Sequence, residues 1–250
     1  MIKIDNVEVF GWEAAIRGMR NPMNSWDKSD SKFFNNYDEG IQDFILGPND
    51  LKLMKSLSKA GSDHAKFLRM INGTVDITAP LYWWKEFDTY KVGTVANSCS
   101  TMHKITEKEF NIDDFSYEHL MSPDDVEHEF YGKEEDGDIY LPHHKIITRS
   151  PLENLKQIID TLNFFRNRYL TTKAKPMKDE SKRKELMKKY WWQMIQLLPS
   201  SYNQKRTVQL NYQVLKAMYF ARRNHKLDEW HDFCAWCESL PYFKEICIQE

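Results

Sequence analysis

One stretch rich in aromatic side chains, Ala79 to Met102, constrains the fold of this 250-residue chain more than any other. Its first half predicts a helix over Leu81 to Lys91, because apolar side chains recur there at three- and four-residue steps. Pro80 fits the first turn of this helix, where its missing N–H costs no hydrogen bond. The residues expected on the buried face are Tyr82, Trp83, Phe87 and Tyr90.

The second half of the stretch consists mainly of small, hydrogen-bonding residues. Such side chains fill a core poorly and surround a polar ligand well, so we predict a binding loop carried by a rigid helix. An ordinary surface loop after a core helix explains the same residues equally well. The residues concerned are Gly93, Thr94, Asn97, Ser98, Cys99, Ser100 and Thr101.

Ser98, Cys99 and Ser100 place two hydroxyls and a thiol side by side in this loop. A nucleophilic cysteine needs a cation or a helix N-terminus that lowers the pKa of its thiol. Lys91 and His103 are near in sequence, which is no evidence that they are near in space. The three groups serve equally well as hydrogen-bond donors to a phosphate, and we prefer that role.

The composition excludes several classes of protein. A net charge of −2 gives no general reason to expect a nucleic-acid partner. Four cysteines without a signal peptide suggest reduced thiols, and no apolar run approaches the roughly 18 residues of a membrane span. We therefore expect a soluble, cytoplasmic protein. The high aromatic content, 14%, favours core packing, although subunit contacts or platforms for planar ligands are alternatives.

The rest of the chain predicts several helices and few strands. Asn49 or Asp50 is the expected N-cap of a helix that ends near Ala60. Arg17 and Arg20 are expected on one helix face; paired arginines suit a phosphate or a carboxylate, but a solvated face is the more frequent role. The predicted strands are Ile2–Val9 and Thr74–Thr78, and the predicted helices include Trp12–Met19, Leu152–Leu170, Leu186–Leu198, Thr207–Arg223 and Leu227–Leu240.

Two charged segments could bind a ligand, but we prefer the explanation that their charges face solvent. The acidic segment at about 104–150 predicts an exposed insertion in a single domain, 1–250, and its spacing matches no calcium loop. Lys173 to Lys189 is basic, but acidic residues interrupt it, so we expect a solvated helix entrance.

The residue types and spacing of His231, Cys234 and Cys237 suggest metal ligands, but nothing else in the sequence supports a metal site. A zinc site needs four converging ligands, and a second cysteine pair is missing. We therefore predict that Cys234 and Cys237 are small buried residues and that the chain has no metal site.

Several motifs together resemble the flavin-dependent thymidylate synthases. In that family a proline-led aromatic helix ends in Arg-His-Arg, and a serine follows after seven residues. Here the segment Ala79 to Asp88 leads to Thr89-Tyr90-Lys91, and Cys99 follows after seven residues. Further matches are Gly61 to Met70 for the family's Gly-His to Glu-His segment, Leu198-Pro199, Asn211, Arg222 and Asp228-Glu229-Trp230.

The signature departs from the family at several positions. Lys91 alone keeps a positive charge, and a lysine cannot grip a phosphate with two parallel hydrogen bonds as an arginine does. The other departures are Cys99 for serine, Thr101 and Gln213 for arginines, and Arg69-Met70 for Glu-His. Cations that would compensate are Arg17, Arg20, Arg69 and Arg206.

The resemblance implies an α+β fold, a small mainly antiparallel sheet flanked by long helices, and a homotetramer with sites between subunits. It implies FAD as cofactor, with NADPH and methylene-tetrahydrofolate as co-substrates, and dUMP as the nucleotide substrate. Arg222 would be catalytic and hold the pyrimidine. The remaining substrate-binding residues would be Glu86, Ser98, Cys99 and Ser100, and the cofactor-binding residues Thr89, Tyr90, Lys91, Asn211, Gln213 and Arg69.

The leading hypothesis is therefore an enzyme that modifies a pyrimidine deoxynucleotide, most simply by reductive methylation of dUMP to dTMP. A nucleotide hydroxymethylase on the same fold is a second possibility. A catalytically silent relative that binds a nucleotide or a protein is the third, and the altered Thr89-Tyr90-Lys91 favours it.

Overall fold

The computed structural model describes residues 2–36, 41–125 and 149–249, which form two compact units. Unit 1 comprises Met1–Ala79, Trp83–Ser98 and Lys205–Glu250, and unit 2 comprises Pro80–Tyr82 and Cys99–Gln204. The single domain predicted over 1–250 is not tested by this division and stays a prediction.

A four-stranded sheet forms the centre of unit 1, in the order β1-β4-β6-β5. β1 pairs with β4, and β5 with β6, in the antiparallel sense. Residues alternate along β4 between buried and half-buried, so one face of this strand lies in the core. The strands are β1 (Lys3–Phe10), β4 (Asn72–Pro80), β5 (Thr94–Ser98) and β6 (Asn203–Asn211).

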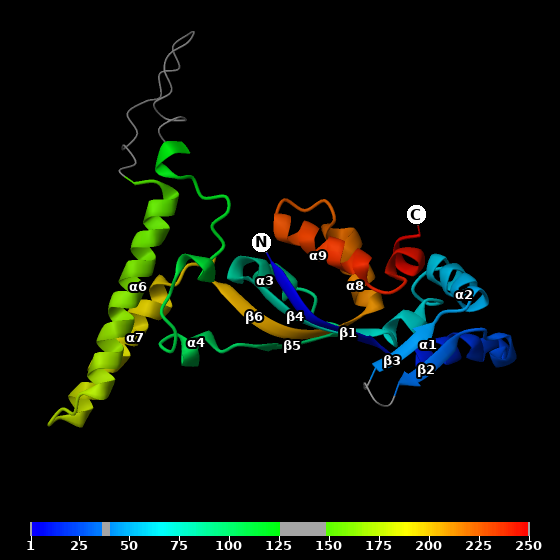
Figure 1. Cartoon of the computed structure of the whole chain (residues 1–250), viewed down its shortest axis with the longest axis horizontal. Helices are drawn as coiled ribbons and strands as arrows, with labels where there is room; N and C mark the ends of the chain where they lie inside the picture. Colours follow the sequence, from blue (N-terminus) through cyan, green and yellow to red (C-terminus); the bar gives the residue numbers. More distant parts are fainter. Residues whose placement is uncertain (1, 37–40, 126–148, 250) are drawn as a thin grey trace, which may run out of the picture. The chain divides into compact units, whose positions relative to one another are not determined.

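Helices α3 (Leu81–Phe87), α8 (Tyr212–Arg222) and α9 (Asp228–Ser239) lie on one side of this sheet (Figure 1). Trp83 of α3 is fully buried, and its ring centroid lies 4.8 Å from that of Trp230 on α9. Each aromatic side chain removes a large apolar surface from water, so this contact anchors α3 to α9. The predicted aromatic helix is confirmed, although it ends at Phe87.

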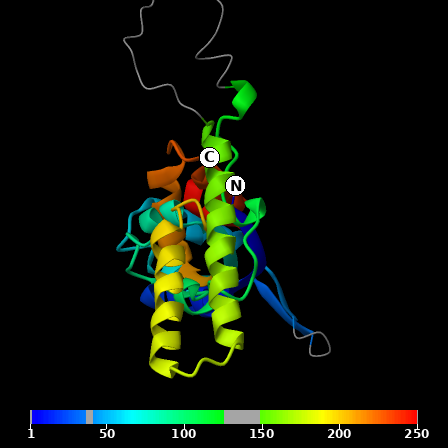
Figure 2. The same cartoon turned by 90° about the vertical axis from the view of Figure 1, so that its left-hand side faces the viewer.

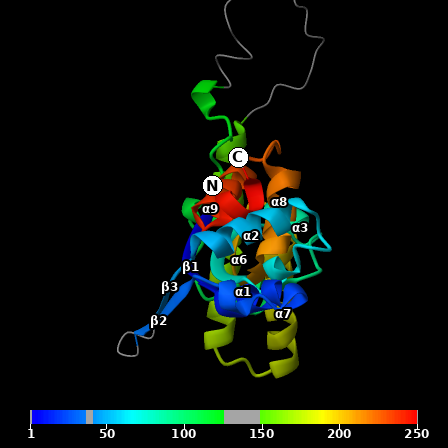
Figure 3. The same ribbon diagram turned by 90° about the vertical axis from the view of Figure 1, so that its right-hand side faces the viewer.

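The other elements of unit 1 include a two-stranded hairpin, which Figure 3 shows extending away from the helices. The ring of Trp12 stacks on Phe44 of the hairpin with 4.7 Å between centroids. No hairpin is expected here from the residue pattern. These elements are α1 (Trp12–Arg20), η1 (Asn21–Met23), η2 (Trp26–Lys28), β2 (Lys32–Asn36), β3 (Ile41–Ile45), α2 (Pro48–Lys59), η3 (Lys66–Arg69) and η5 (Lys244–Ile248).

A buried ion pair joins α1 to α2. Nε and Nη2 of Arg20 each lie 2.6 Å from Oδ1 of Asp50, and these side chains are 5% and 0% exposed. Ser29 and Ser31 donate hydroxyl hydrogen bonds to Oδ2 of the same carboxylate. The expected solvated role of Arg20 is therefore wrong, because the carboxylate of Asp50 recruits it into the interior. Neither Asn49 nor Asp50 caps the following helix, since it begins at Pro48 with Gly47 as its N-cap.

Unit 2 is built on the long helices α6 (Pro151–Ala174) and α7 (Glu180–Leu197), which run side by side (Figures 1 and 2). Ser150 caps α6 and accepts a hydrogen bond from the Glu153 N–H. The amphipathic helix predicted at Leu152–Leu170 is confirmed, since Leu155, Ile159 and Leu162 are buried.

Residues 105–120 of unit 2 pack apolar side chains against α6 and α7. The segment 101–120 carries α4 (Thr101–Lys104) and η4 (Ile112–Asp114), and it buries Ile105, Phe110 and Phe115. These residues fall in the segment expected to be an exposed insertion. Its first part is therefore core, because aromatic residues lie between the acidic ones, and 126–148 lies outside the described residues.

Two segments have a secondary structure that differs from the prediction. Thr94–Ser98, expected as loop, is the edge strand β5, and the helix expected from Thr207 begins only at Tyr212. Val208 and Leu210 alternate with exposed residues in β6, a period of two that the helical spacing of the following residues obscures. Within the described ranges no helix has the length and apolarity to cross a bilayer.

We expect the substitution Asp50→Asn to lower the free energy of unfolding by about 3 kcal/mol, because it leaves Arg20 buried without its counter-charge. Asp5→Asn is the matched control, since its partner Lys3 is 73% exposed and such a pair contributes little. Urea denaturation followed by tryptophan fluorescence measures both. Equal small effects would contradict a stabilising role of the buried pair.

The stabilisation by Asp50 also depends on pH. Burial raises the pKa of Asp50, but hydrogen bonds from Ser31, Ser29 and Arg20 lower it below the usual 3.8 in total. A lowered folded-state pKa gives stabilisation that is present above the unfolded-state pKa and lost as pH falls through the folded value. The difference between the native chain and Asp50→Asn should therefore be largest near neutral pH and shrink below about pH 4.

Candidate functional site

Arg222, in the last turn of α8, is held by residues of α3 and the turn after it. Its Nη1 donates to Oε2 of Glu86 at 2.6 Å, and its Nε donates to the hydroxyl of Tyr90 at 2.9 Å. The guanidinium carbon lies 4.9 Å from the ring centroid of Trp230, a distance at which a cation is attracted to the ring face. The structure therefore brings together three predicted site residues, Glu86, Tyr90 and Arg222.

The third guanidinium nitrogen of Arg222 remains available. Nη2 has no hydrogen-bonding partner among the residues that the structure describes, and the side chain is 18% exposed. The arginine is thus fixed in orientation and presents one free edge. Such a group can donate to an oxygen of a ligand without first changing its conformation.

His225 also belongs to this cluster, and the sequence analysis did not single it out. Its Nε2 lies 3.1 Å from Oε2 of Glu86, and its Nδ1 accepts a hydrogen bond from the Leu227 N–H at 3.1 Å. The available signal was its position three residues after Arg222 and just before α9. We define Glu86, Tyr90, Arg222, His225 and Trp230 as the Arg222 cluster.

Asn211 and Gln213 lie at the start of α8. Asn211 caps the helix, and its Oδ1 accepts from the Val214 N–H at 3.0 Å. Oε1 of Gln213 is buried without a hydrogen-bonding partner in the described part of the chain. A buried oxygen without a donor costs free energy, so this position suits a ligand that supplies an N–H or O–H.

Gly93 forms the turn that leads into β5 beside Asn211. Its φ is +80°, and an added Cβ would lie 2.9 Å from Cγ2 of Val214 and 3.0 Å from Nδ2 of Asn211. Glycine therefore allows both the backbone conformation and the close approach to Asn211.

The other predicted cofactor residues make few contacts of their own. Thr89 donates its hydroxyl to the Glu86 carbonyl at 2.7 Å and so ends α3. Lys91 is exposed, and Arg69 is exposed in η3. Thr89 thus contacts the backbone of the Arg222 cluster at Glu86, whereas among the described residues no hydrogen bond or ion pair joins the side chains of Lys91 and Arg69 to it.

The predicted phosphate-binding residues are divided between the units. Ser98 ends β5 opposite Arg206, whereas Thr94 lies opposite Leu210, so Ser98 is about 13 Å along the strand from the end near Asn211. Cys99 and Ser100 belong to unit 2, where Gln204 donates to the Cys99 carbonyl at 3.0 Å. The prediction that these residues meet the same ligand as Arg222 stays a prediction.

The four arginines considered as compensating cations have different environments. Arg20 is buried against Asp50 and cannot serve. Arg206 pairs with Asp88 at 2.7 Å, and its guanidinium carbon lies 4.2 Å from the ring centroid of Trp84. Arg17 and Arg69 are exposed.

Cys234 and Cys237 are buried in α9, which confirms the prediction of small buried residues. Burial raises the pKa of the Cys234 thiol to about 11, so the thiol stays protonated at neutral pH. Among the described residues, no three His, Cys, Asp or Glu side chains converge as metal ligands.

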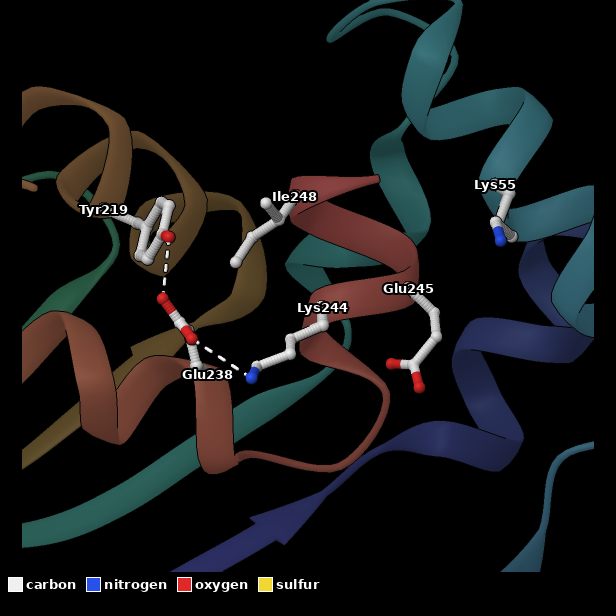
Figure 4. A pocket seen from close by; sticks show the side chains of 6 residues that line it. All are labelled: Lys55, Tyr219, Glu238, Lys244, Glu245 and Ile248. Carbon is white, nitrogen blue, oxygen red and sulfur yellow. Dashed lines mark hydrogen bonds and ion pairs between the residues drawn. The ribbon is translucent and has the colours of Figure 1, made fainter. Parts of the chain in front are cut away.

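Unit 1 also contains a small cavity of about 200 Å³, which Figure 4 shows from close by. Its polar groups are partly paired, since Tyr219 donates to Glu238 at 2.8 Å and Lys244 lies 3.1 Å from the same carboxylate. None of the site residues predicted from the sequence lines this cavity. The lining residues are Lys55, Tyr219, Glu238, Lys244, Glu245 and Ile248.

We expect Gly93→Ala to destabilise unit 1 by more than the roughly 1 kcal/mol that a positive φ costs an alanine. Gly61→Ala is the matched control, because Gly61 has a φ of +107° and nothing lies within 4 Å of an added Cβ. Denaturant unfolding compares the two variants. Equal destabilisation of the two variants would mean that the close approach of Gly93 to Asn211 does not add to the cost of the substitution.

Comparison with known proteins identifies the fold. No protein-family model matches the sequence. No curated protein matches it either. Thymidylate synthase X (ThyX) from Helicobacter pylori with FAD and dUMP matches with a TM-score of 0.57 and 15% identity, over 99% of this chain and 97% of the other.

A second structure, of flavin-dependent thymidylate synthase ThyX from Helicobacter pylori complexed with FAD and dUMP, matches with a TM-score of 0.56 and 15% identity. This match covers 97% of this chain and 98% of the other. The predicted α+β architecture is thus confirmed: the chain has the fold of these ThyX structures along nearly its whole length.

Proposed function

We propose that the chain is a pyrimidine deoxynucleotide-modifying enzyme, most simply one that reductively methylates dUMP to dTMP. FAD would be its cofactor, and NADPH and methylene-tetrahydrofolate its co-substrates. A fold alone hosts many functions, so the proposal depends on the site. The observation that carries it is the fixed Arg222 guanidinium with its free Nη2.

The geometry of Arg222 suits a pyrimidine better than a phosphate. Tyr90 accepts from Nε, so the two-pronged grip on a phosphate through Nε and Nη2 is not available, and Glu86 already takes one of the two N–H groups of Nη1. One remaining nitrogen matches a single carbonyl oxygen of a uracil ring. Arg222 would hold this oxygen and stabilise negative charge that develops on it.

The described residues fit the flavin less well than the pyrimidine. The unpartnered Oε1 of Gln213 and the start of α8 favour a ligand there. Against this, Tyr90 is engaged with Arg222, and Lys91 is the only cation in the altered signature. The small cavity of unit 1 is far below the volume of FAD and lies on other residues. We therefore derive no chemical step through the flavin.

A flavin site formed by two copies of the chain would explain why the residues of one copy fit the flavin poorly. In the proposed homotetramer a second copy would supply further cations and the walls of the flavin site, and Ser98, Cys99 and Ser100 would bind the substrate phosphate. Exposed Arg17 and Arg69 are available for such contacts.

We expect Arg222→Lys to weaken dUMP binding about 10- to 100-fold, because a hydrogen bond from a charged group contributes roughly 1.5–3 kcal/mol. Arg223→Lys is the matched control, since Arg223 is exposed and stacks only on Phe220 in the described structure. Isothermal titration calorimetry with dUMP, in the presence of FAD, measures both variants. Unchanged affinity in Arg222→Lys would contradict the proposed role of Arg222.

Product analysis separates the candidate functions. We expect dUMP incubated with FAD, NADPH and methylene-tetrahydrofolate to gain a methyl group, as measured by mass spectrometry, and dCMP to stay unmodified. A hydroxymethylated product would favour the hydroxymethylase. No product, together with failure to complement a thymidine-requiring strain at good expression, would favour the silent relative, which the altered Thr89-Tyr90-Lys91 and the Arg222–Glu86 ion pair support.

A further inference from the structure

We propose that His225 is a positioning residue for Arg222 and acts through Glu86. The proposal rests on the proposed function only for the identity of the ligand that Arg222 meets. All contacts involved lie within unit 1, between α3, α8 and the segment that precedes α9.

The hydrogen bonds of His225 determine which ring nitrogen carries the proton. The backbone N–H of Leu227 donates to Nδ1 at 3.1 Å, so Nδ1 acts as an acceptor and has no proton. In the neutral ring the proton is then on Nε2, and Nε2 lies 3.1 Å from Oε2 of Glu86. His225 therefore turns its Nε2 edge toward Glu86 from a ring whose orientation the backbone fixes.

Glu86 transmits this constraint to Arg222. Its Oε2 accepts from Nη1 of Arg222 at 2.6 Å and lies 3.1 Å from Nε2 of His225. A glutamate has three rotatable side-chain bonds, and this carboxylate is 34% exposed, so a single contact would leave it several rotamers. The second contact, with Nε2 of His225, selects the rotamer that faces Arg222.

The position of the Arg222 guanidinium is then defined from three directions. Glu86 holds Nη1, the Tyr90 hydroxyl holds Nε, and the Trp230 ring lies against the guanidinium face. Loss of the Glu86 contact would leave one hydrogen bond, about which the group can turn. His225 thus keeps Nη2 directed toward the ligand without contacting the ligand itself.

A merely structural role for His225 is the competing explanation. Its Nδ1 contact with the Leu227 N–H helps to shape the segment before α9, and any variant that disturbs this segment would also disturb the cluster. Two substitutions separate the roles. His225→Asn keeps a side-chain acceptor near Nδ1 but lacks the donor to Glu86, whereas His225→Gln carries an amide N–H about as far out as Nε2.

The experiment measures the exchange with water of the Arg222 Nε–H by nitrogen-15 NMR, with the resonance assigned by its loss in Arg222→Lys. In His225→Asn the hydrogen bond between Glu86 and Nη1 of Arg222 is weakened, so the guanidinium can turn away from Tyr90. We therefore expect about tenfold faster exchange of the Nε–H in this variant. Exchange in His225→Gln should stay close to that of the native chain. Amide spectra of both variants verify folding.

Unchanged exchange in His225→Asn would overturn the proposal. Equally fast exchange in both variants would also overturn it, since His225 would then act through the backbone segment alone. In a Glu86→Met background, His225→Asn should have no further effect because the connecting carboxylate is gone. Additive effects of the two substitutions would contradict transmission through Glu86.

The exchange measurement needs neither FAD nor dUMP, so its outcome is independent of the proposed function. Titration of dUMP into the same variants gives the second readout: the affinity should fall in His225→Asn and recover in His225→Gln. If the native chain binds no dUMP, the proposed function fails while the exchange result still decides the role of His225.

Discussion

The candidate site depends on the packing of Trp83 in α3 against Trp230 in α9. Both side chains are fully buried, and removal of either would leave a cavity whose cost is about 3–5 kcal/mol. This contact fixes the short helix α3, and α3 in turn determines where Glu86 projects and where the chain turns at Tyr90. The same Trp230 ring lies against Arg222, so one aromatic contact supports both the core and the functional group.

The contacts of Arg222 allow two interpretations, a structural ion pair or a preorganised hydrogen-bond donor. An arginine already paired with a glutamate resembles a structural ion pair, yet a guanidinium fixed by three neighbours with one free nitrogen is a preorganised donor. The partial exposure of Arg222 and the unpartnered Nη2 within the described residues favour the second interpretation. Tyr90, within the segment Thr89-Tyr90-Lys91, supports Arg222 through its hydroxyl.

The sequence predicts much of the fold and only part of the site, for physical reasons. Strong periodicity reveals α1, α6 and α9, because an amphipathic pattern marks the buried face of a helix whichever element covers it. β6 is hidden because Leu210 fits both its alternation and the spacing of the helix that follows. Asp50 and His225 escape prediction because their roles come from Arg20 and Glu86, distant residues that only the folded chain brings near.

A crystal structure of the protein soaked with dUMP and FAD tests the central claim most directly. We expect an oxygen of the pyrimidine within hydrogen-bond distance of Nη2 of Arg222, with Nε and Nη1 still held by Tyr90 and Glu86. A nucleotide bound away from Arg222, or an Arg222 that releases Glu86 to grip the phosphate, would contradict it.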